Sequence, residues 1–226
     1  MNPGVRNTVL ILLVIVFAIA AGSYFSFKNK LDAEKEAEMA KRETFASVQG
    51  NVLSPERKIS VPELIMHDGT AFTEEDLQGQ WSILFFGFTN CMHVCPTAMS
   101  VLTQAKKLAE EKGVEFPTVY LVSVDPARDT PEAMKKFVKG FDSDFNGVTG
   151  DPEMLKALSL QMSVIYMRAN SADKEGESGK EDNYQVDHSS AFLLLNKQAH
   201  LKAFLNPPHT PEKVMTDIKT ILDASS

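Results

Sequence analysis

The stretch that decides the fold is residues 82–96, SILFFGFTNCMHVCP. It opens with an uninterrupted apolar run over 82–88, which is typical of a strand buried on both faces of a sheet. A helix is expected after Pro96, because apolar side chains recur there at helical spacing, at Leu102, Ala105, Leu108 and Ala109. Two cysteines, Cys91 and Cys95, therefore lie between a buried strand and a helix.

These are the only two cysteines of the chain, and they are too close in sequence to cross-link distant parts of a fold. The residue before a proline avoids the α region, so Cys95 is expected as the N-cap and Pro96 as the first helical residue. The positive end of a helix favours thiolate over thiol. Three intervening residues also let both sulfurs converge on one ion or on each other. We therefore interpret the cysteines as a reactive or metal-binding pair.

The remaining elements predict an α/β fold with a central sheet. Apolar runs predict strands over Thr118–Val124, Ser190–Leu195 and Leu201–Phe204, and a hairpin is expected to open the domain over Lys58–Leu64 and the turn 67–69. Three helix starts repeat one device, an N-cap side chain followed by proline and glutamate, at Thr130, Asp151 and Thr210.

The N-terminal segment, residues 1–30, is expected to anchor the chain in a membrane. No charged side chain occurs from Asn7 to Phe27, and as a helix these residues would span about 31 Å, close to the ~30 Å of a bilayer core. The span is placed at about 8–27. The alternative is a cleaved signal peptide with a small-residue site at Ala18–Ala20. Either interpretation sends the rest of the chain across a membrane.

Residues 31–57 are expected to form a charged stalk and linker, with the folded domain at 58–226. Leu31–Thr44 has the Glu- and Lys-rich composition of an exposed helix, and 45–57 is taken as the linker. A polar segment, Ala169–Asn183, is interpreted as a mobile loop or as a tolerated surface insertion.

The charge balance excludes one large class of partner. Residues 1–30 carry three basic side chains and no acid, so within a total of −7 the rest of the chain carries −10. Nucleic acid binding needs clustered Lys and Arg, so no nucleic acid partner is expected. A cationic partner, or none, suits this surface.

A third metal ligand is expected from a histidine. The chain has five, and His67, His200 and His209 are expected in turns or at the surface. His93 lies between the cysteines and could serve as an extra ligand. His188 is expected to end a loop and open the strand at 190–195, and such strand ends meet near a helix N-terminus in open α/β sheets. Its neighbour Asp187 could at best hydrogen-bond to a metal ligand, without binding the metal itself.

Two thiolates and one imidazole form a soft donor set. It suits Cu(I), which accepts three ligands, and could hold Cu(II) with an added oxygen. Zinc stays open, although it would want a fourth ligand.

Three segments together resemble the Sco/SenC family of cytochrome c oxidase assembly proteins over about 58–224 and the N-terminal anchor: GFT followed by C-x3-CP over 87–96, SVDPARDTP over 123–131, and YQVDHS over 184–189. The resemblance implies a thioredoxin-like fold with an added N-terminal hairpin and an insertion. It implies copper bound by Cys91, Cys95 and His188. Asn90, Met92 and His93 depart from the residues most common in the family, which puts loop rigidity and partner recognition in question.

The same resemblance implies insertion in the bacterial inner membrane, with the domain in the periplasm, and delivery of copper to the binuclear copper centre of cytochrome c oxidase subunit II. Because a disulfide offers no thiolate to copper, we expect a thiol-reducing thioredoxin-like partner as well as a periplasmic copper donor. Two alternatives remain. One is a thiol–disulfide oxidoreductase that reduces the acceptor's cysteines, and the other is a copper or redox sensor. An enzymatic role is otherwise not expected.

Overall fold

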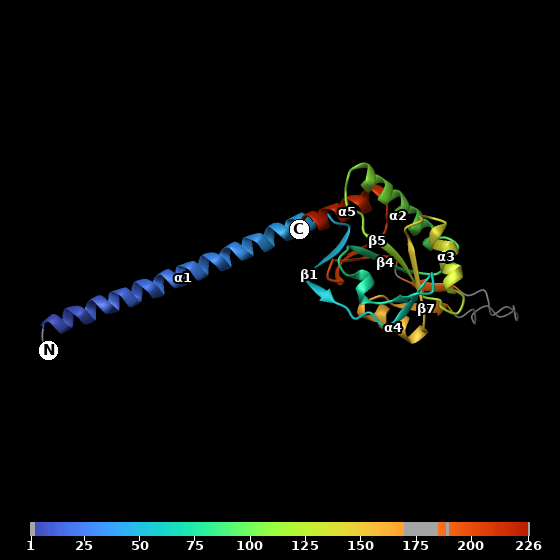
Figure 1. Cartoon of the computed structure of the whole chain (residues 1–226). Helices are drawn as coiled ribbons and strands as arrows, with labels where there is room; N and C mark the ends of the chain where they lie inside the picture. Colours follow the sequence, from blue (N-terminus) through green and yellow to red (C-terminus); the bar gives the residue numbers. More distant parts are fainter. Residues whose placement is uncertain (1–2, 170–184, 189, 226) are drawn as a thin grey trace. The chain divides into compact units, whose positions relative to one another are not determined.

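The computed structural model describes residues 3–169, 185–188 and 190–225, and it divides into two compact units, 1–47 and 48–226 (Figure 1). In the first unit one helix, α1 (Pro3–Phe45), includes the predicted helical stalk. Arg42 pairs with Glu38 across one turn, at 3.1 Å. Among the residues whose placement is described, we find no helix with both the length and the hydropathy of a membrane span.

The second unit is built on an eight-stranded sheet in the order β1-β10-β9-β4-β5-β6-β2-β3. Its strands are β1 (Gly50–Lys58), β2 (Leu64–Met66), β3 (Ala71–Phe72), β4 (Ser82–Gly87), β5 (Thr118–Ser123), β6 (Asn146–Thr149), β9 (Phe192–Leu195) and β10 (His200–Leu205). β4, β5 and β6 run parallel, whereas β9 is antiparallel to β4 and β10 is antiparallel to β9. A hairpin, β2–β3, does form around the predicted turn 67–69, at the β6 side of the sheet. Its first strand is Leu64–Met66 rather than the predicted Lys58–Leu64, because Lys58 ends β1 and residues 59–63 are not in a strand.

The centre of the sheet confirms the strand predicted from the apolar run. All six residues of β4 are buried, and Leu84, Phe85 and Phe86 are at most 1% exposed. Burying one such side chain contributes about 1.5–3 kcal/mol, so this strand organises the core. The ring of Phe85 packs edge-on against that of Phe192 in β9, with centroids 5.5 Å apart.

Helices cover the sheet, and three of them begin where the repeated device predicts. They are α2 (Val94–Glu111), α3 (Pro131–Lys139), α4 (Pro152–Gln161) and α5 (Pro211–Asp223), with a short 3-10 helix, η1 (Glu74–Leu77). Thr130, Asp151 and Thr210 each accept a hydrogen bond from a backbone N–H of the first turn. Figure 1 shows α2 and α5 together on one side of the sheet, with α4 on the other. The order β4–α2–β5, then β9–β10–α5, is the core expected of a thioredoxin-like fold.

The boundaries of the predicted linker and of the polar loop also differ from the structure. Residues 45–57 are not only a linker, because Gly50–Lys58 forms β1, paired antiparallel with β10, and the compact unit begins at Val48 rather than near Lys58. A two-stranded ribbon, β7 (Tyr166–Ala169) with β8 (Gln185–His188), flanks the predicted polar loop. Residues 170–184 of that loop lie outside the described residues.

His67, expected in a turn, is 7% exposed, and its ring Nδ1 accepts the Gly147 N–H at 3.2 Å. Burial lowers the pKa of His67 and nearby Lys139 lowers it further, although Asp68 opposes them. The folded state therefore binds a proton less readily than the unfolded chain, whose histidine titrates near 6.5. We expect the free energy of unfolding to be unaffected by this group above pH 6.5 and to fall as the pH drops through the lower, folded pKa.

The variant His67→Asn isolates this contribution, because the amide oxygen can still accept from Gly147 but does not titrate in this range. Denaturant unfolding of both proteins from pH 8 to pH 5 is the measurement. The difference between them should grow in favour of the variant as the pH falls. Parallel curves would show that the ring proton does not matter.

Candidate metal centre

The cysteine loop, residues 88–95, joins the end of β4 to the start of α2. Its backbone turns back where the Cys91 N–H donates to the Phe88 carbonyl at 3.3 Å. Cys91 is partly exposed and Cys95 is fully buried, so the two sulfurs differ in their access to solvent. The two sulfurs are not joined in a disulfide.

The proline rule predicted Cys95 as the N-cap of the helix, and this prediction is wrong. α2 begins at Val94 with His93 as its N-cap, so Pro96 is the third residue of the first turn. A proline is tolerated there because the first four N–H groups of a helix have no intrahelical partner. The Cys95 N–H, one of these four groups, donates to Cys91 Sγ at 3.3 Å. The Cys91 sulfur thus takes the acceptor role that a capping side chain usually has.

The buried sulfur of Cys95 is suited to a soft metal ion. Removal from water raises the pKa of the Cys95 thiol well above its usual range, and the Cys91 sulfur and Asp129 add to the effect. The thiol therefore keeps its proton in the absence of a cation. A metal ion that binds there must displace that proton, which makes its binding depend on pH.

Gly87, the last residue of β4, leaves the space in which the Cys95 sulfur lies. A methyl group on Gly87 would lie 3.0 Å from Cys95 Sγ and 3.0 Å from Leu121 Cδ1. These contacts are tighter than most real side-chain contacts, so a larger residue would require the Cys95 sulfur or a neighbouring core side chain to shift by a few tenths of an ångström. Glycine is needed here for close packing rather than for an unusual backbone angle.

A buried carboxylate, Asp129, holds the first half of the cysteine loop. Its Oδ1 accepts from the Thr89 N–H at 3.1 Å and from the Thr89 hydroxyl at 2.6 Å. Its Oδ2 accepts from the Ser123 hydroxyl at 2.6 Å. Asp129 is 0% exposed, and burial raises the pKa of its carboxyl while these hydrogen bonds oppose the rise. The motif over 123–131 thus supplies the carboxylate that holds the cysteine loop, a role that sequence reasoning did not assign to it.

The same motif braces the loop at a second point. Asp125 is fully buried and pairs with the guanidinium of Arg128. That guanidinium lies over the ring of Phe88, 5.8 Å from its centroid. The Val124 N–H also donates to the Gly87 carbonyl at 2.9 Å. The loop that carries Cys91 is therefore tied to the end of β5 by both side chains and backbone.

His188 is placed by its backbone alone. It ends β8, opposite Tyr166 of β7, and does not open the strand at 190–195 as expected, since β9 starts at Phe192. The side chains of His188 and Asp187 lie outside the described residues. Among the side chains that are described, no group of three or more His, Cys, Asp or Glu residues is arranged to hold a metal ion.

A cavity of about 280 Å³ adjoins the cysteine loop. His93 and Val94 of the loop line it, together with Ser190 and His209. The cavity therefore places Ser190, which is two residues beyond His188 in the sequence, next to the loop that carries the cysteines. The His93 side chain, which lies between the two cysteines in the sequence, is exposed to solvent. His209, expected at the surface, is instead partly buried in this cavity.

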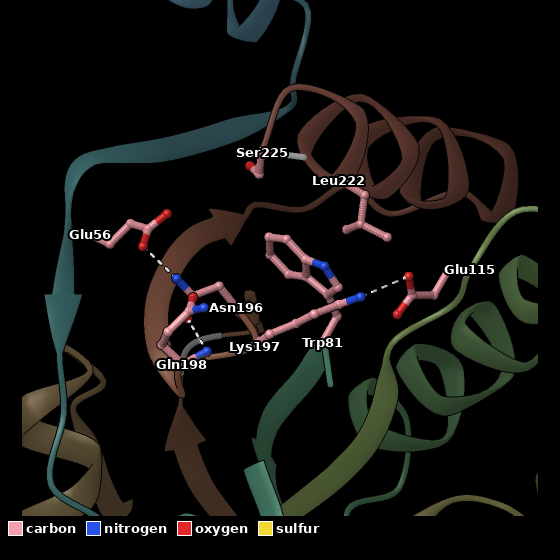
Figure 2. A pocket seen from close by; sticks show the side chains of 8 residues that line it. All are labelled: Glu56, Trp81, Glu115, Asn196, Lys197, Gln198, Leu222 and Ser225. Carbon is pink, nitrogen blue, oxygen red and sulfur yellow. Dashed lines mark hydrogen bonds and ion pairs between the residues drawn. The ribbon is translucent and has the colours of Figure 1, made fainter. Parts of the chain in front are cut away.

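A second cavity, about 380 Å³, lies at the other end of β4. Figure 2 shows its lining, with Trp81 at the centre, Glu56 on one side and Glu115 on the other, and with Lys197 extending towards Glu115. Lys197 Nζ lies 3.4 Å from Glu115, and Glu56 pairs with Lys202 at 2.9 Å and accepts from Asn196. Six residues of β4, about 20 Å, separate Trp81 from the cysteine loop, so this cavity is not part of the candidate centre.

Comparisons with known proteins agree on one family. The SCO1/SenC family model matches residues 54–223. An SCO2-like protein of Rickettsia prowazekii is 34% identical over 158 residues, which cover 69% of this chain and 74% of that protein. Arabidopsis thaliana ScoI with copper bound has a TM-score of 0.63 at 30% identity, covering 77% of this chain and 98% of that one. Bradyrhizobium japonicum ScoI with copper bound has a TM-score of 0.56 at 29% identity, covering 70% and 94%.

Proposed function

The chain belongs to the SCO1/SenC family, as its sequence motifs predicted, and on this premise we propose that it is a copper chaperone that binds one copper ion through Cys91, Cys95 and His188. Relatives of the same fold have been solved with copper bound. Two thiolates and an imidazole suit Cu(I) and can accept Cu(II) with an added oxygen ligand. Copper is the cargo of this site.

The observation that carries the proposal is the cavity shared by the cysteine loop and Ser190. His93, Val94 and Ser190 all line it. Two residues of extended chain reach about 7 Å, so His188 is tethered close to the loop that presents Cys91. The partly exposed Cys91 is accessible to a partner, whereas Cys95 is buried. This difference suits an ion that enters and leaves by way of Cys91.

The acceptor in this proposal is the binuclear copper centre of cytochrome c oxidase subunit II, as the family resemblance implies. A copper donor and a thiol-reducing thioredoxin-like protein complete the cycle. The reductant is required because copper binds the thiolates and not a disulfide. Transfer would pass through shared ligation, in which an acceptor ligand replaces Cys91 before the buried Cys95 releases the ion.

The asymmetry of the two sulfurs also favours a second candidate, a thiol–disulfide oxidoreductase. The Cys91 thiolate would attack a disulfide of the acceptor and release one acceptor sulfur as a thiolate. Cys95 would then lose its proton and attack Cys91, releasing the second acceptor thiolate and leaving a Cys91–Cys95 disulfide. Two electrons pass to the acceptor in this sequence. His188 has no part in it.

The variant His188→Ala separates the two functions. If His188 is a ligand, Cu(I) affinity should fall by about 100-fold. Loss of a residue that only hydrogen-bonds to a metal ligand weakens metal binding by about 10–100-fold, and the loss of the ligand itself is placed at the upper end of that range. The measurement is a Cu(I) titration of the reduced protein against a competing chelator, with His200→Ala as the matched control. Turnover with a disulfide substrate should be unchanged in both variants. Unchanged copper affinity in His188→Ala would remove this residue from the site.

We further propose that residues 8–27 hold the chain in the bacterial inner membrane, with the compact unit in the periplasm. The proposal rests on the uncharged stretch from Asn7 to Phe27. Alkaline extraction should leave the full chain in the membrane fraction and release a chain that starts at Val48. Release of both, or a mature N-terminus just after Ala20, would replace the anchor with a cleaved signal.

A further inference from the structure

We propose that His209 is a positioning residue that sets the place of the His188 segment against the cysteine loop, by holding the Ser190 carbonyl. This inference rests on the proposed role of His188 as a copper ligand. His209 is not itself assigned as a ligand. Its effect on copper would act through the backbone between Ser190 and His188.

The turn that carries His209 is held at both ends. Before it, the Gln49 side chain donates to the Asn206 carbonyl at 2.9 Å and to the Pro208 carbonyl at 2.6 Å. After it, Thr210 caps α5 by accepting from the Lys213 N–H at 3.3 Å. The imidazole therefore projects from a fixed piece of backbone and can act as a support for another segment.

The contact with Ser190 has a defined direction. His209 Nε2 lies 2.8 Å from the Ser190 carbonyl oxygen, and because a carbonyl can only accept, the proton is on Nε2. The ring also stacks on Phe192, with centroids 4.0 Å apart and planes 17° apart. Burial lowers the pKa of His209, which keeps the ring neutral near pH 7. The His209 side chain thus contacts both Phe192, the first residue of β9, and Ser190, two residues before it.

The backbone is held by contacts on both sides of His188. On its N-terminal side, β8 is paired with β7, with His188 opposite Tyr166. On its C-terminal side, His209 holds Ser190. His93 and Val94, which follow Cys91 closely in the chain, line the same cavity as Ser190 and His209. A shift of Ser190 would change the separation between the His188 backbone and the cysteines, and a metal site tolerates little such change.

The test compares His209→Phe, which keeps a stacking ring but loses the donor, with His209→Gln, which keeps an N–H donor. In the full chain, His209→Phe should weaken Cu(I) binding about tenfold against a competing chelator, the lower end of the effect of losing an outer-shell partner of a metal ligand. It should also change the electron spin resonance spectrum of the Cu(II)-loaded protein. His209→Gln should recover most of the affinity, and His200→Phe should leave it unchanged.

A double-mutant cycle ties the effect to His188. In a His188→Ala background, His209→Phe should have no further effect on Cu(I) affinity, because there is no ligand left to position. An equal loss in both backgrounds, or no loss in a folded His209→Phe variant, would overturn the proposal. Should His209→Phe fail to fold, Gln49→Met, which frees the supporting turn, enters the same cycle with the same expectation. If His188→Ala alone leaves affinity intact, the proposed function fails first, and the cycle shows it.

Discussion

Replacement of Asp129 by alanine is expected to destabilise the protein by about 3 kcal/mol or more, because each buried donor left without an acceptor costs about 1–3 kcal/mol. Three donors lose their acceptor: the Thr89 N–H, the Thr89 hydroxyl and the Ser123 hydroxyl. Such a loss is a large share of the 5–15 kcal/mol that typically separates folded from unfolded protein. Denaturant unfolding of the reduced, metal-free protein measures it.

Asp129→Asn and Thr89→Val divide this effect into parts. The asparagine oxygen can still accept both Thr89 donors, and only the Ser123 hydroxyl must find a new partner, so a loss of about 1 kcal/mol is expected. Thr89→Val removes one hydroxyl and keeps the N–H contact, so its loss should be similar. Copper affinity should fall most in Asp129→Ala, because Thr89 lies two residues before Cys91. Equal stability of the alanine and asparagine variants would contradict this account of the network.

The sequence predicted those parts of the fold that depend on local signals. The strand at 82–88 was visible because a strand buried on both faces is apolar throughout. The helix starts at Thr130, Asp151 and Thr210 were visible because capping needs a specific side chain within the first turn. The cysteine loop was found for the same reason, since both sulfurs and the helix lie within a few residues of one another.

The features that could not be predicted from the sequence depend on contacts between distant residues or on rules that have exceptions. β1 was taken as a linker because an edge strand with charges and Pro55 resembles one in composition. Cys95 was taken as an N-cap because the proline rule has an exception in the first helical turn. The Thr89–Asp129 contact spans 40 residues, and the His209–Ser190 contact depends on how α5 returns to the sheet. No local pattern announces either contact.

The second large effect is expected from Gly87→Ala. Its new methyl group would meet Cys95 Sγ at 3.0 Å, Leu121 Cδ1 at 3.0 Å and Phe85 Cε1 at 3.2 Å. All three neighbours are buried in the core, so they have little room to move. Overpacking of this kind costs about 1–3 kcal/mol. The strain should be relieved in part by displacement of the Cys95 sulfur, and Cu(I) affinity should fall by at least tenfold.

Gly147→Ala is the matched control, because its methyl group would meet Met134 Cβ at 2.9 Å on the contact between β6 and α3. This variant is expected to lose a similar amount of stability and to bind Cu(I) as tightly as the parent protein. The comparison matters because general loosening of the core would lower copper affinity in both variants alike. If only Gly87→Ala loses copper, the glycine at the end of β4 is retained for the position of one sulfur, and the buried thiol is a ligand. If Gly87→Ala binds copper normally while it is destabilised, Cys95 has a packing role and the metal centre must be built without it.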